Sequence, residues 1–218
     1  MEVVLVRHGR PLIERRRSGI ADPGLDPYGE WQAERVSEWL THEPVDAIVT
    51  SPKARAIETV TPLMRRLDMV NEVVADLDEI DRGAATYIPT DLLPTEGGEY
   101  WENIIAQKWD EIGWDPPEVF AARIRGAWND LVANPRGDHV VVGCHGGTIR
   151  GILAAVIGED SPAFHVQTQF ASITRIKVEN GQSRIMSANE TGHFDADRIG
   201  LRGPMNTHAD LLRRRAVR

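Results

Sequence analysis

Two histidines stand at the ends of two apolar runs that lie far apart in the chain. His8 follows the branched aliphatic run that begins at Val3, and His145 follows the run that begins at Val140. Each run is typical of a buried strand, and the glycine after each histidine allows a sharp turn that exposes the preceding side chain. Because ligands bind at the carboxyl edge of an open α/β sheet, we expect both imidazoles to meet at one site there.

Positively charged side chains accompany these histidines and suit a phosphate. Arg7 precedes His8, and a turn at Gly9 can bring both side chains towards one ligand. A guanidinium holds phosphate through two parallel hydrogen bonds, while a neutral imidazole can attack phosphorus. Arg55 lies in the first turn of a helix expected to begin at Ser51, where free backbone amides also bind anions.

A carboxyl group completes the candidate site. Glu79 comes just after a predicted strand and is suited to proton transfer, and His145 adds a further hydrogen-bond donor. This combination favours phosphoryl transfer with no metal ion and no other cofactor. The sequence contains no pair of histidines at i and i+4 and no Cys-x-x-Cys pair, so it offers no familiar metal motif.

Composition sets the broad class of the protein. The chain has 218 residues, 41% of them apolar, which suffices for one sizeable core, and no Pro/Gly/Ser-rich linker divides it. The single cysteine, Cys144, excludes an internal disulfide and is expected to pack in the core rather than act as a nucleophile. Without a signal peptide or a membrane-spanning stretch, the sequence predicts a soluble cytoplasmic protein. The net charge of -8 argues against nucleic-acid binding.

The apolar spacing predicts strands alternating with helices, and a loop over residues 10–27. Helices are expected at 28–41, 51–67, 117–134 and 148–157, strands at 46–50, 73–77 and 139–144, and a hairpin at 171–178 and 183–188. This order predicts a single three-layer α/β/α domain with a mostly parallel mixed sheet, over residues 1–204. An aromatic helical cap is expected as an insert at about 83–115, and a basic tail at 205–218.

Four motifs, in this order, resemble those of the histidine phosphatase superfamily, which is also called phosphoglycerate mutase-like. They are Arg7-His8-Gly9, Ser51-Pro52-Lys53-Ala54-Arg55-Ala56-Ile57-Glu58-Thr59, Leu77-Asp78-Glu79 and Val141-Val142-Gly143-Cys144-His145-Gly146-Gly147-Thr148-Ile149-Arg150. Segments 25–33 and 189–194 are also similar to segments of family members, so the resemblance spans roughly residues 1 to 194. We identify the chain on these motifs as a member of the phosphatase branch.

The resemblance implies a role for each matching residue. His8 would be the nucleophile that becomes phosphorylated on a ring nitrogen, while Arg7, Arg55 and His145 hold the phosphoryl oxygens. Glu79 would be the general acid that protonates the leaving alkoxide and later activates water. The implied activity is metal-independent hydrolysis of the phosphate monoester of a small metabolite. Because His8 must be unprotonated to attack, its neighbours should lower its pKa or fix its tautomer.

Residues next to these motifs are further candidates for substrate contact. Gly146 follows His145, and Arg10 and Ser18 lie in the loop that should rim the pocket. The three arginines at 15–17 belong to the same loop, and they either contact substrate or form part of a solvated surface. A surface ion pair with Glu58 is the alternative role for Arg55.

The chain departs from the family pattern at two places. Glu14 occupies the position where many members carry an asparagine that touches phosphate, and a carboxylate there would repel phosphate unless Arg15 or Arg10 pairs with it. The segment after Glu79 lacks the tryptophan that many members carry, so Asp81 is kept as the alternative acid.

Other functions therefore stay open. A mutase would return the phosphoryl group to a second hydroxyl, and a catalytically weak member would only bind a ligand or regulate. A phosphatase acting on phosphohistidine or phosphotyrosine in proteins would need a shallow, open site. The cap can be a small helical unit with its own contacts, a lid that shapes the pocket, or both at once. The basic tail could bind a partner or complete a homodimer. His165 and His193 are expected to be structural or exposed.

Overall fold

A six-stranded sheet forms the centre of the protein, with the strand order β4-β3-β6-β1-β7-β8. The computed structural model describes residues 1–89, 92–158 and 166–194. Strands β4, β3, β6 and β1 run parallel, whereas β7 and β8 are each antiparallel to their neighbours. The strands are β1 (Glu2–Arg7), β3 (Ala47–Thr50), β4 (Asn71–Val73), β6 (His139–Cys144), β7 (Ile173–Glu179) and β8 (Gln182–Glu190).

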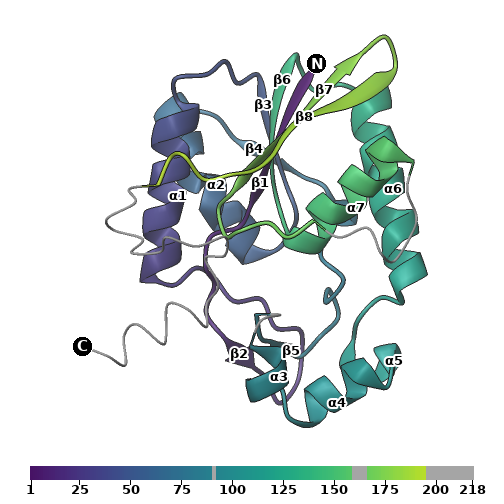
Figure 1. Ribbon diagram of the computed structural model, residues 1–218. Coiled ribbons are helices and arrows are strands. Elements are labelled where there is room, and N and C mark those ends of the chain that lie inside the picture. Colours follow the sequence, from purple (N-terminus) through teal and green to yellow (C-terminus); the bar gives the residue numbers. More distant parts are fainter. Residues whose placement is uncertain (90–91, 159–165, 195–218) are drawn as a thin grey trace.

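Helices cover both faces of this sheet (Figure 1). They are α1 (Pro27–Leu40) and α2 (Ala54–Leu67) on one face, and α6 (Pro117–Ala133) and α7 (Gly146–Ile157) on the other. Alternate side chains of a strand point to opposite faces, so Val4 and Val6 of β1 pack with α1 and α2, while Val3 and Leu5 pack with α6 and α7. The predicted three-layer α/β/α fold is confirmed.

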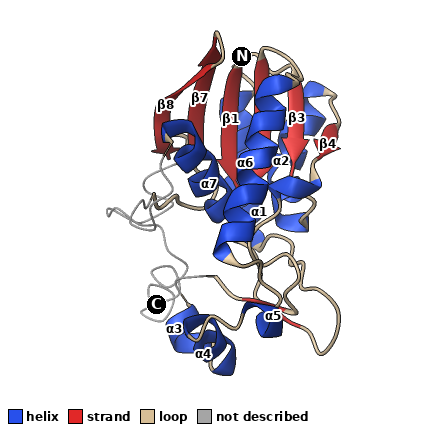
Figure 2. Cartoon of the chain, turned by 90° about the vertical axis from the view of Figure 1, so that its right-hand side faces the viewer, coloured by secondary structure: helices blue, strands red, loops and turns tan. Residues whose placement is uncertain are grey.

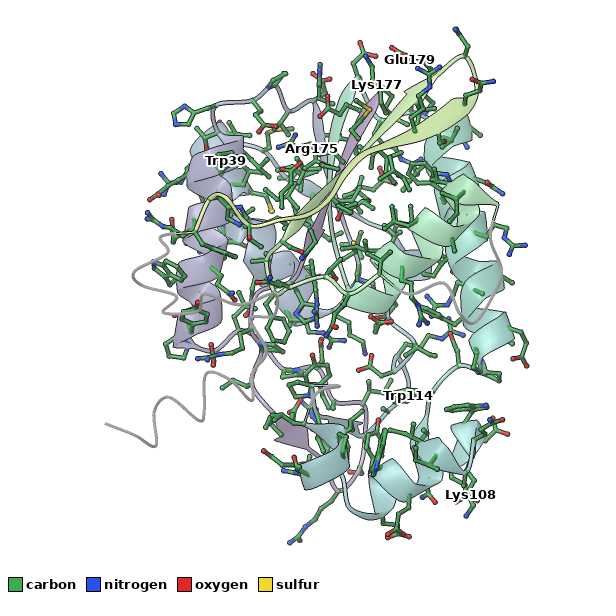
Figure 3. All side chains as sticks on the ribbon, in the orientation of Figure 1. Trp39, Lys108, Trp114, Arg175, Lys177 and Glu179 are labelled. Carbon is green, nitrogen blue, oxygen red and sulfur yellow. The ribbon has the colours of Figure 1, made fainter. Side chains whose placement is uncertain are left out.

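A smaller unit, the cap, lies beyond the ends of β1 and β3 (Figure 2). Its elements are β2 (Glu14–Arg15), β5 (Thr86–Tyr87), α3 (Leu93–Glu96), α4 (Glu99–Ile105) and α5 (Trp109–Ile112). Strands β2 and β5 pair, which joins the loop after β1 to the insert. An apolar cluster of the cap has Ile88, Leu92 and Leu93 as its buried residues. The ring of Trp114, labelled in Figure 3, stacks on that of Trp109. The insert therefore has hydrophobic contacts of its own.

The strand predicted at 73–77 is wrong. Strand β4 ends at Val73, and Ala75–Leu77 forms a short 3-10 helix instead. The reason is that Leu77 is fully buried in the core while Val73 is 51% exposed, so the chain turns inwards between them instead of continuing along the sheet edge. This turn brings the segment that carries Glu79 to the carboxyl edge of the sheet.

Other elements also differ from the predictions, most of them by only one or two residues at an end. The helix expected from Ser51 begins at Ala54, with Lys53 at the N-cap position, and the Ser51 hydroxyl contacts His145. Helix α7 begins two residues early, at Gly146, and the predicted loop over 10–27 contains β2. None of the helices in the described residues is long and apolar enough to cross a membrane. The basic tail and His165 lie outside the described residues.

Candidate active site

His8 lies directly after β1, held by the backbone on both sides. Its N–H donates to the carbonyl of Cys144 at 2.9 Å, and its carbonyl accepts from the N–H of Ala171 at 3.0 Å. The chain then turns at Gly9, where an added Cβ would lie only 2.7 Å from the carbonyl oxygen of Gly29. Glycine is therefore required at this turn, as the sequence predicts, and it leaves the His8 ring at the carboxyl edge of the sheet.

The hydrogen bonding of His8 fixes which ring nitrogen is available for chemistry. Its Nδ1 lies 2.8 Å from the carbonyl oxygen of Gly9. Because a carbonyl can only accept, Nδ1 carries the proton of the neutral ring and Nε2 keeps its lone pair. Burial, followed by the charges of Arg55 and Arg7, holds the pKa of His8 well below its ordinary value. At neutral pH the ring is thus uncharged, in the form that can act as a nucleophile.

Arg7 lies beside His8 and packs on an aromatic ring. Its Nη1 donates to the carbonyl of Thr168, and its guanidinium carbon lies 4.3 Å from the ring centre of Phe170. The same ring lies 5.6 Å from that of His8, so Phe170 packs against both side chains. A Cβ added at Gly146 would lie 3.3 Å from Arg7 Nε, so this glycine lets the start of α7 approach the guanidinium closely.

Arg55 lies in the first turn of α2 and is 1% exposed. Its Nη2 donates to Asp81 Oδ1 at 3.2 Å, and its guanidinium lies 4.4 Å from the ring centre of Tyr87 in the cap. Within the described residues, Arg55 Nε and Nη1 have no hydrogen-bond acceptor, which leaves two donors for an anion. Glu58, the alternative partner, instead accepts from the N–H of Leu25 at 2.7 Å.

His145 faces His8, with 5.2 Å between the ring centres. Its Nε2 lies 2.6 Å from the hydroxyl oxygen of Ser51, which itself accepts the N–H of Lys53 at 3.2 Å. A hydroxyl has one donor and two acceptor positions, so Ser51 can donate its own proton to Nε2. The ring proton then sits on Nδ1, which has no hydrogen-bond partner within the described residues and is left for a ligand. Burial, followed by the charge of Arg55, holds the pKa of His145 well below its ordinary value. His145 is therefore a neutral donor.

Glu79 reaches the site from the segment after Leu77 and is bound by backbone amides. Its Oε2 accepts from the N–H of Gly147 at 2.8 Å, and its Oε1 accepts from the N–H of Ile80 at 2.9 Å. A Cβ at Gly147 would lie 2.2 Å from Oε1, so only glycine lets α7 come this close. Burial, followed by the charge of Asp81, raises the pKa of Glu79. A carboxyl group that keeps its proton longer is suited to acid catalysis.

Two predicted contact residues lie in other surroundings. Arg10 Nε donates to Asp26 Oδ2 at 2.5 Å, and the Arg10 guanidinium lies 4.6 Å from the ring centre of Tyr28. Since Asp26 also caps the start of α1, the Arg10 side chain connects the loop to that helix. Ser18 is exposed in the loop that follows β2. Substrate contact by either residue stays a prediction.

The partner expected for Glu14 is wrong. Its Oε1 accepts from Arg16 Nε at 2.8 Å, and its Oε2 accepts from the backbone N–H of Asp22 at 2.8 Å. Arg10 turns to α1, while Arg15 reaches the carbonyl of Glu96 in the cap at 3.1 Å. The Glu14 carboxylate therefore organises its own loop.

Several groups around the site escape sequence reasoning. They are Ser51, Lys53, Asp78, Tyr87, Phe170 and Arg123. Ser51, Lys53 and Asp78 stand inside the quoted motifs, and this position is a sequence signal that could have identified them. Lys53 Nζ donates to the carbonyl of Arg82 at 3.1 Å and lies 3.9 Å from Asp78 Oδ2. Tyr87 belongs to the aromatic insert that is expected as a cap, although its contact with Arg55 is not predicted, whereas Phe170 comes from a segment with no motif and only the fold brings it here.

The assembled groups suit an anion. Arg7 and Arg55 supply positive charge, the two neutral imidazoles supply a lone pair and a donor, and Glu79 can supply a proton. Such an arrangement matches the charge that develops on phosphoryl oxygens during transfer. Across residues 1–89, 92–158 and 166–194, no cluster of three or more His, Cys, Asp or Glu side chains could hold a metal ion.

The sequence as a whole matches one family model. The model of the histidine phosphatase superfamily (branch 1) matches residues 3–191, nearly the full described chain. The chain belongs to the histidine phosphatase superfamily. The resemblance carried by the four motifs is therefore confirmed.

Relatives of this superfamily member carry both phosphatase and mutase names. A protein of Bacillus subtilis (strain 168) named as an uncharacterized phosphatase is 26% identical over 194 residues, covering 88% of this chain and 96% of that protein. A Salmonella paratyphi A protein named "probable phosphoglycerate mutase" is 24% identical over 209 residues, covering 90% and 96%. The crystal structure of the alpha-ribazole phosphatase from Shigella flexneri superposes with a TM-score of 0.69 at 18% identity, covering 87% and 96%. The family and its phosphatase-named relatives support a phosphatase enzyme.

Proposed function

We propose that this protein hydrolyses phosphate monoesters by transferring the phosphoryl group to Nε2 of His8. The observation that carries the proposal is the 2.8 Å contact between His8 Nδ1 and the carbonyl oxygen of Gly9, from which the Nδ1–H tautomer of the neutral ring follows. Nε2 then presents its lone pair within a buried, positively charged site. His145 is buried near the same two guanidinium groups, but its Nε2 is bound to the hydroxyl of Ser51.

In the first step, His8 Nε2 attacks phosphorus and the bond from phosphorus to the ester oxygen breaks. Arg7, Arg55 and the Nδ1–H of His145 bind the phosphoryl oxygens, in a partly dry site where such interactions are strong. Glu79 gives its proton to the departing alkoxide, which leaves as an alcohol. The raised pKa of Glu79 keeps that proton available at higher pH than for an ordinary carboxyl group.

In the second step, water attacks the phosphohistidine. The Glu79 carboxylate takes a proton from the water, the bond from Nε2 to phosphorus breaks, and inorganic phosphate leaves. Glu79 ends protonated and His8 neutral, so both residues are ready for another turnover. The same carboxyl group thus acts as acid and then as base, and the N–H of Gly147 at the start of α7 binds it.

A small phosphorylated metabolite is the proposed substrate. The cap stands over the sheet edge, and Tyr87 of β5 packs directly on Arg55. The ring of Tyr87 beside the phosphate site favours a small substrate over a phosphorylated protein. The name of the alpha-ribazole phosphatase, a structural neighbour, fits this substrate class.

The proposal is tested by phosphate release from a panel of phosphorylated metabolites and p-nitrophenyl phosphate, with EDTA present. We expect release by the wild type that is lost in His8→Ala. The matched control is His139→Ala, since His139 begins β6 at the opposite end of the sheet. Wild-type activity that survives in His8→Ala, or that EDTA abolishes, would contradict the proposal.

A mutase is the second candidate, favoured by the relative named "probable phosphoglycerate mutase". In a mutase the phosphohistidine would return its phosphoryl group to a second hydroxyl of the substrate rather than to water. Measuring isomerised product beside inorganic phosphate separates the two activities. A predominance of isomer over phosphate would decide for the mutase.

A further inference from the structure

We call residues 76–82, the segment that carries Glu79, the acid loop. Its carbonyl groups are bound from outside the loop by one side chain of helix α6. Arg123 Nη1 donates to the carbonyls of Asp76 at 3.0 Å and Asp78 at 2.7 Å, and Arg123 Nη2 donates to the carbonyl of Glu79 at 3.1 Å. One guanidinium therefore binds the carbonyls of both peptide units that flank Glu79.

Asp115, just before α6, fixes the plane of this guanidinium. Its Oδ2 accepts from Arg123 Nη2 at 2.6 Å and from Arg123 Nε at 3.1 Å. Asp115 also binds the acid loop itself, since its backbone N–H donates to the carbonyl of Ile80 at 2.8 Å and its Oδ1 pairs with Arg82 Nε at 3.0 Å. Arg123 and Asp115 together bind the loop on both sides of Glu79.

The Arg123 side chain is 8% exposed, so these bonds are made mostly away from water. Buried hydrogen bonds of a charged donor are stronger than exposed ones, and a planar guanidinium presents five donors in a fixed fork. A lysine has a single nitrogen, which cannot span three carbonyls and a carboxylate at once. The geometry therefore depends on arginine in particular.

We propose that Arg123 is a positioning residue that acts through Glu79. By holding the carbonyls on either side of it, Arg123 keeps the Glu79 carboxyl group where its proton reaches the leaving oxygen of a substrate bound at His8. The inference rests on the proposed function, because it takes Glu79 as the general acid. Arg123 itself binds the backbone of the acid loop and has no part in binding phosphate.

The consequence is that the rate lost on replacing Arg123 depends on the leaving group of the substrate. A p-nitrophenolate leaves without much help from an acid, whereas an alkoxide needs the proton of Glu79. A misplaced acid should therefore slow alkyl phosphates selectively, and displacement by about 1 Å can cost up to 10²-fold in rate. A purely structural role of Arg123 would slow both substrates alike.

The experiment compares wild type, Arg123→Lys, Glu79→Gln and the double variant on an alkyl phosphate and on p-nitrophenyl phosphate. We expect Arg123→Lys to lose about 10- to 100-fold in kcat on the alkyl phosphate and less than about 3-fold on p-nitrophenyl phosphate. The double variant should be no slower than Glu79→Gln, because both changes remove the same proton transfer. Arg136→Lys, which alters an arginine paired with Glu72 and Asp130 away from the acid loop, is the control and should match wild type.

Two outcomes separate the possible failures. Equal rates of Glu79→Gln and wild type on the alkyl phosphate would overturn the acid role of Glu79 and with it the positioning role of Arg123, whereas phosphoryl transfer to His8 is overturned only by activity that survives in His8→Ala. If Glu79→Gln is selective but Arg123→Lys slows both substrates equally, or adds its loss to that of Glu79→Gln, only the positioning role is overturned.

A second variant covers the case in which Arg123→Lys does not fold. Asp115→Asn leaves Arg123 in place but weakens the contact that orients its guanidinium. Its kcat on the alkyl phosphate should fall more than its kcat on p-nitrophenyl phosphate, but by less than in Arg123→Lys. If folded Asp115→Asn keeps the wild-type ratio of these two kcat values, the proposal is overturned.

Discussion

At the scale of single residues, the chemistry of the site depends on which ring nitrogen of each histidine carries the proton. His8 and His145 both have a lowered pKa, yet their neutral rings differ, because Gly9 binds the Nδ1 side of His8 while Ser51 binds the Nε2 side of His145. One ring thereby offers a lone pair and the other a donor. The sequence predicts both histidines at one edge, but the tautomers depend on hydrogen bonds that only the folded chain makes.

Replacing Ser51 with alanine tests the tautomer of His145. Without the hydroxyl, the neutral ring can place its proton on Nε2 and turn a lone pair towards the phosphoryl oxygens. We expect kcat/KM to fall by roughly 5- to 150-fold, the equivalent of about 1 to 3 kcal/mol for a lost or reversed hydrogen bond. Ser37→Ala, which alters a buried serine of α1, is the matched control. Equal kcat/KM in both variants would refute the role of Ser51.

Asp81→Asn distinguishes the two candidate acids. Asp81 binds Arg55, and its charge raises the pKa of Glu79. The amide should therefore lower the pKa of Glu79, so that the alkaline limb of the kcat profile moves to lower pH, while KM falls because Arg55 is free for phosphate. Measured pH profiles on an alkyl phosphate check both shifts. A loss of acid catalysis in Asp81→Asn with none in Glu79→Gln would assign the acid to Asp81.

At the scale of elements, local patterns predict some parts and fail on others. The runs at β1 and β6 are long and apolar, so they are recognisable as buried strands, and His139–Cys144 is predicted to the residue. Strands β2 and β5 have two residues each and pair Glu14 with Tyr87 across a long separation, which no local pattern encodes. The place of Glu79 likewise depends on the distant side chain of Arg123.

The turn after His8 requires close contact with the start of α1. A Cβ added at Gly29 would lie 2.1 Å from the carbonyl oxygen of Arg10, a backbone atom with little room to move. We expect Gly29→Ala to lower the free energy of unfolding by about 1 to 3 kcal/mol and to reduce kcat, since the turn carries His8.

The matched control for that variant is Gly126→Ala on the exposed side of α6, where an added Cβ meets nothing within 4 Å. It should raise the free energy of unfolding by about 0.5 to 1 kcal/mol, because alanine favours a helix interior. Urea unfolding of the two variants gives the comparison. A Gly29→Ala protein as stable as wild type would show that the contact is not tight.

At the scale of the whole molecule, the sheet edge collects groups from across the chain. Motifs recognisable in the sequence predict His8, Arg7, Arg55, His145 and Glu79, and the fold brings all of them together. The aromatic composition of the insert predicts the cap but not the contact of Tyr87 with Arg55, and the segment around Phe170 has no sequence signal, because these side chains meet only after folding. Substrate choice is expected to depend on these unpredicted parts.

The buried histidines also predict how stability depends on pH. A histidine in the unfolded chain binds a proton near pH 6.5, whereas burial lowers the pKa of His145 in the folded protein. Below about pH 6.5 the unfolded state therefore binds more protons, and stability falls as pH drops, by up to about 1.4 kcal/mol per pH unit for this residue. The raised pKa values of Asp78 and Glu79 act in the opposite direction.

Comparison with His145→Gln isolates the histidine. The difference in free energy of unfolding between wild type and His145→Gln should shrink as the pH is lowered from 7 to 5, because only the wild type must keep this imidazole neutral. Urea unfolding at several pH values measures that difference. A difference that stays constant over the range would contradict the burial effect.

The most direct test of the central role of His8 is to trap the phosphorylated enzyme. Wild type and His8→Ala are mixed with ³²P-labelled substrate, quenched in alkali within one turnover and separated from free phosphate. We expect label on the wild type that is stable in alkali and lost in acid, mapping to His8, and none on the variant. Rapid phosphate release with no labelled protein at any time, or label that maps elsewhere, would contradict transfer through His8.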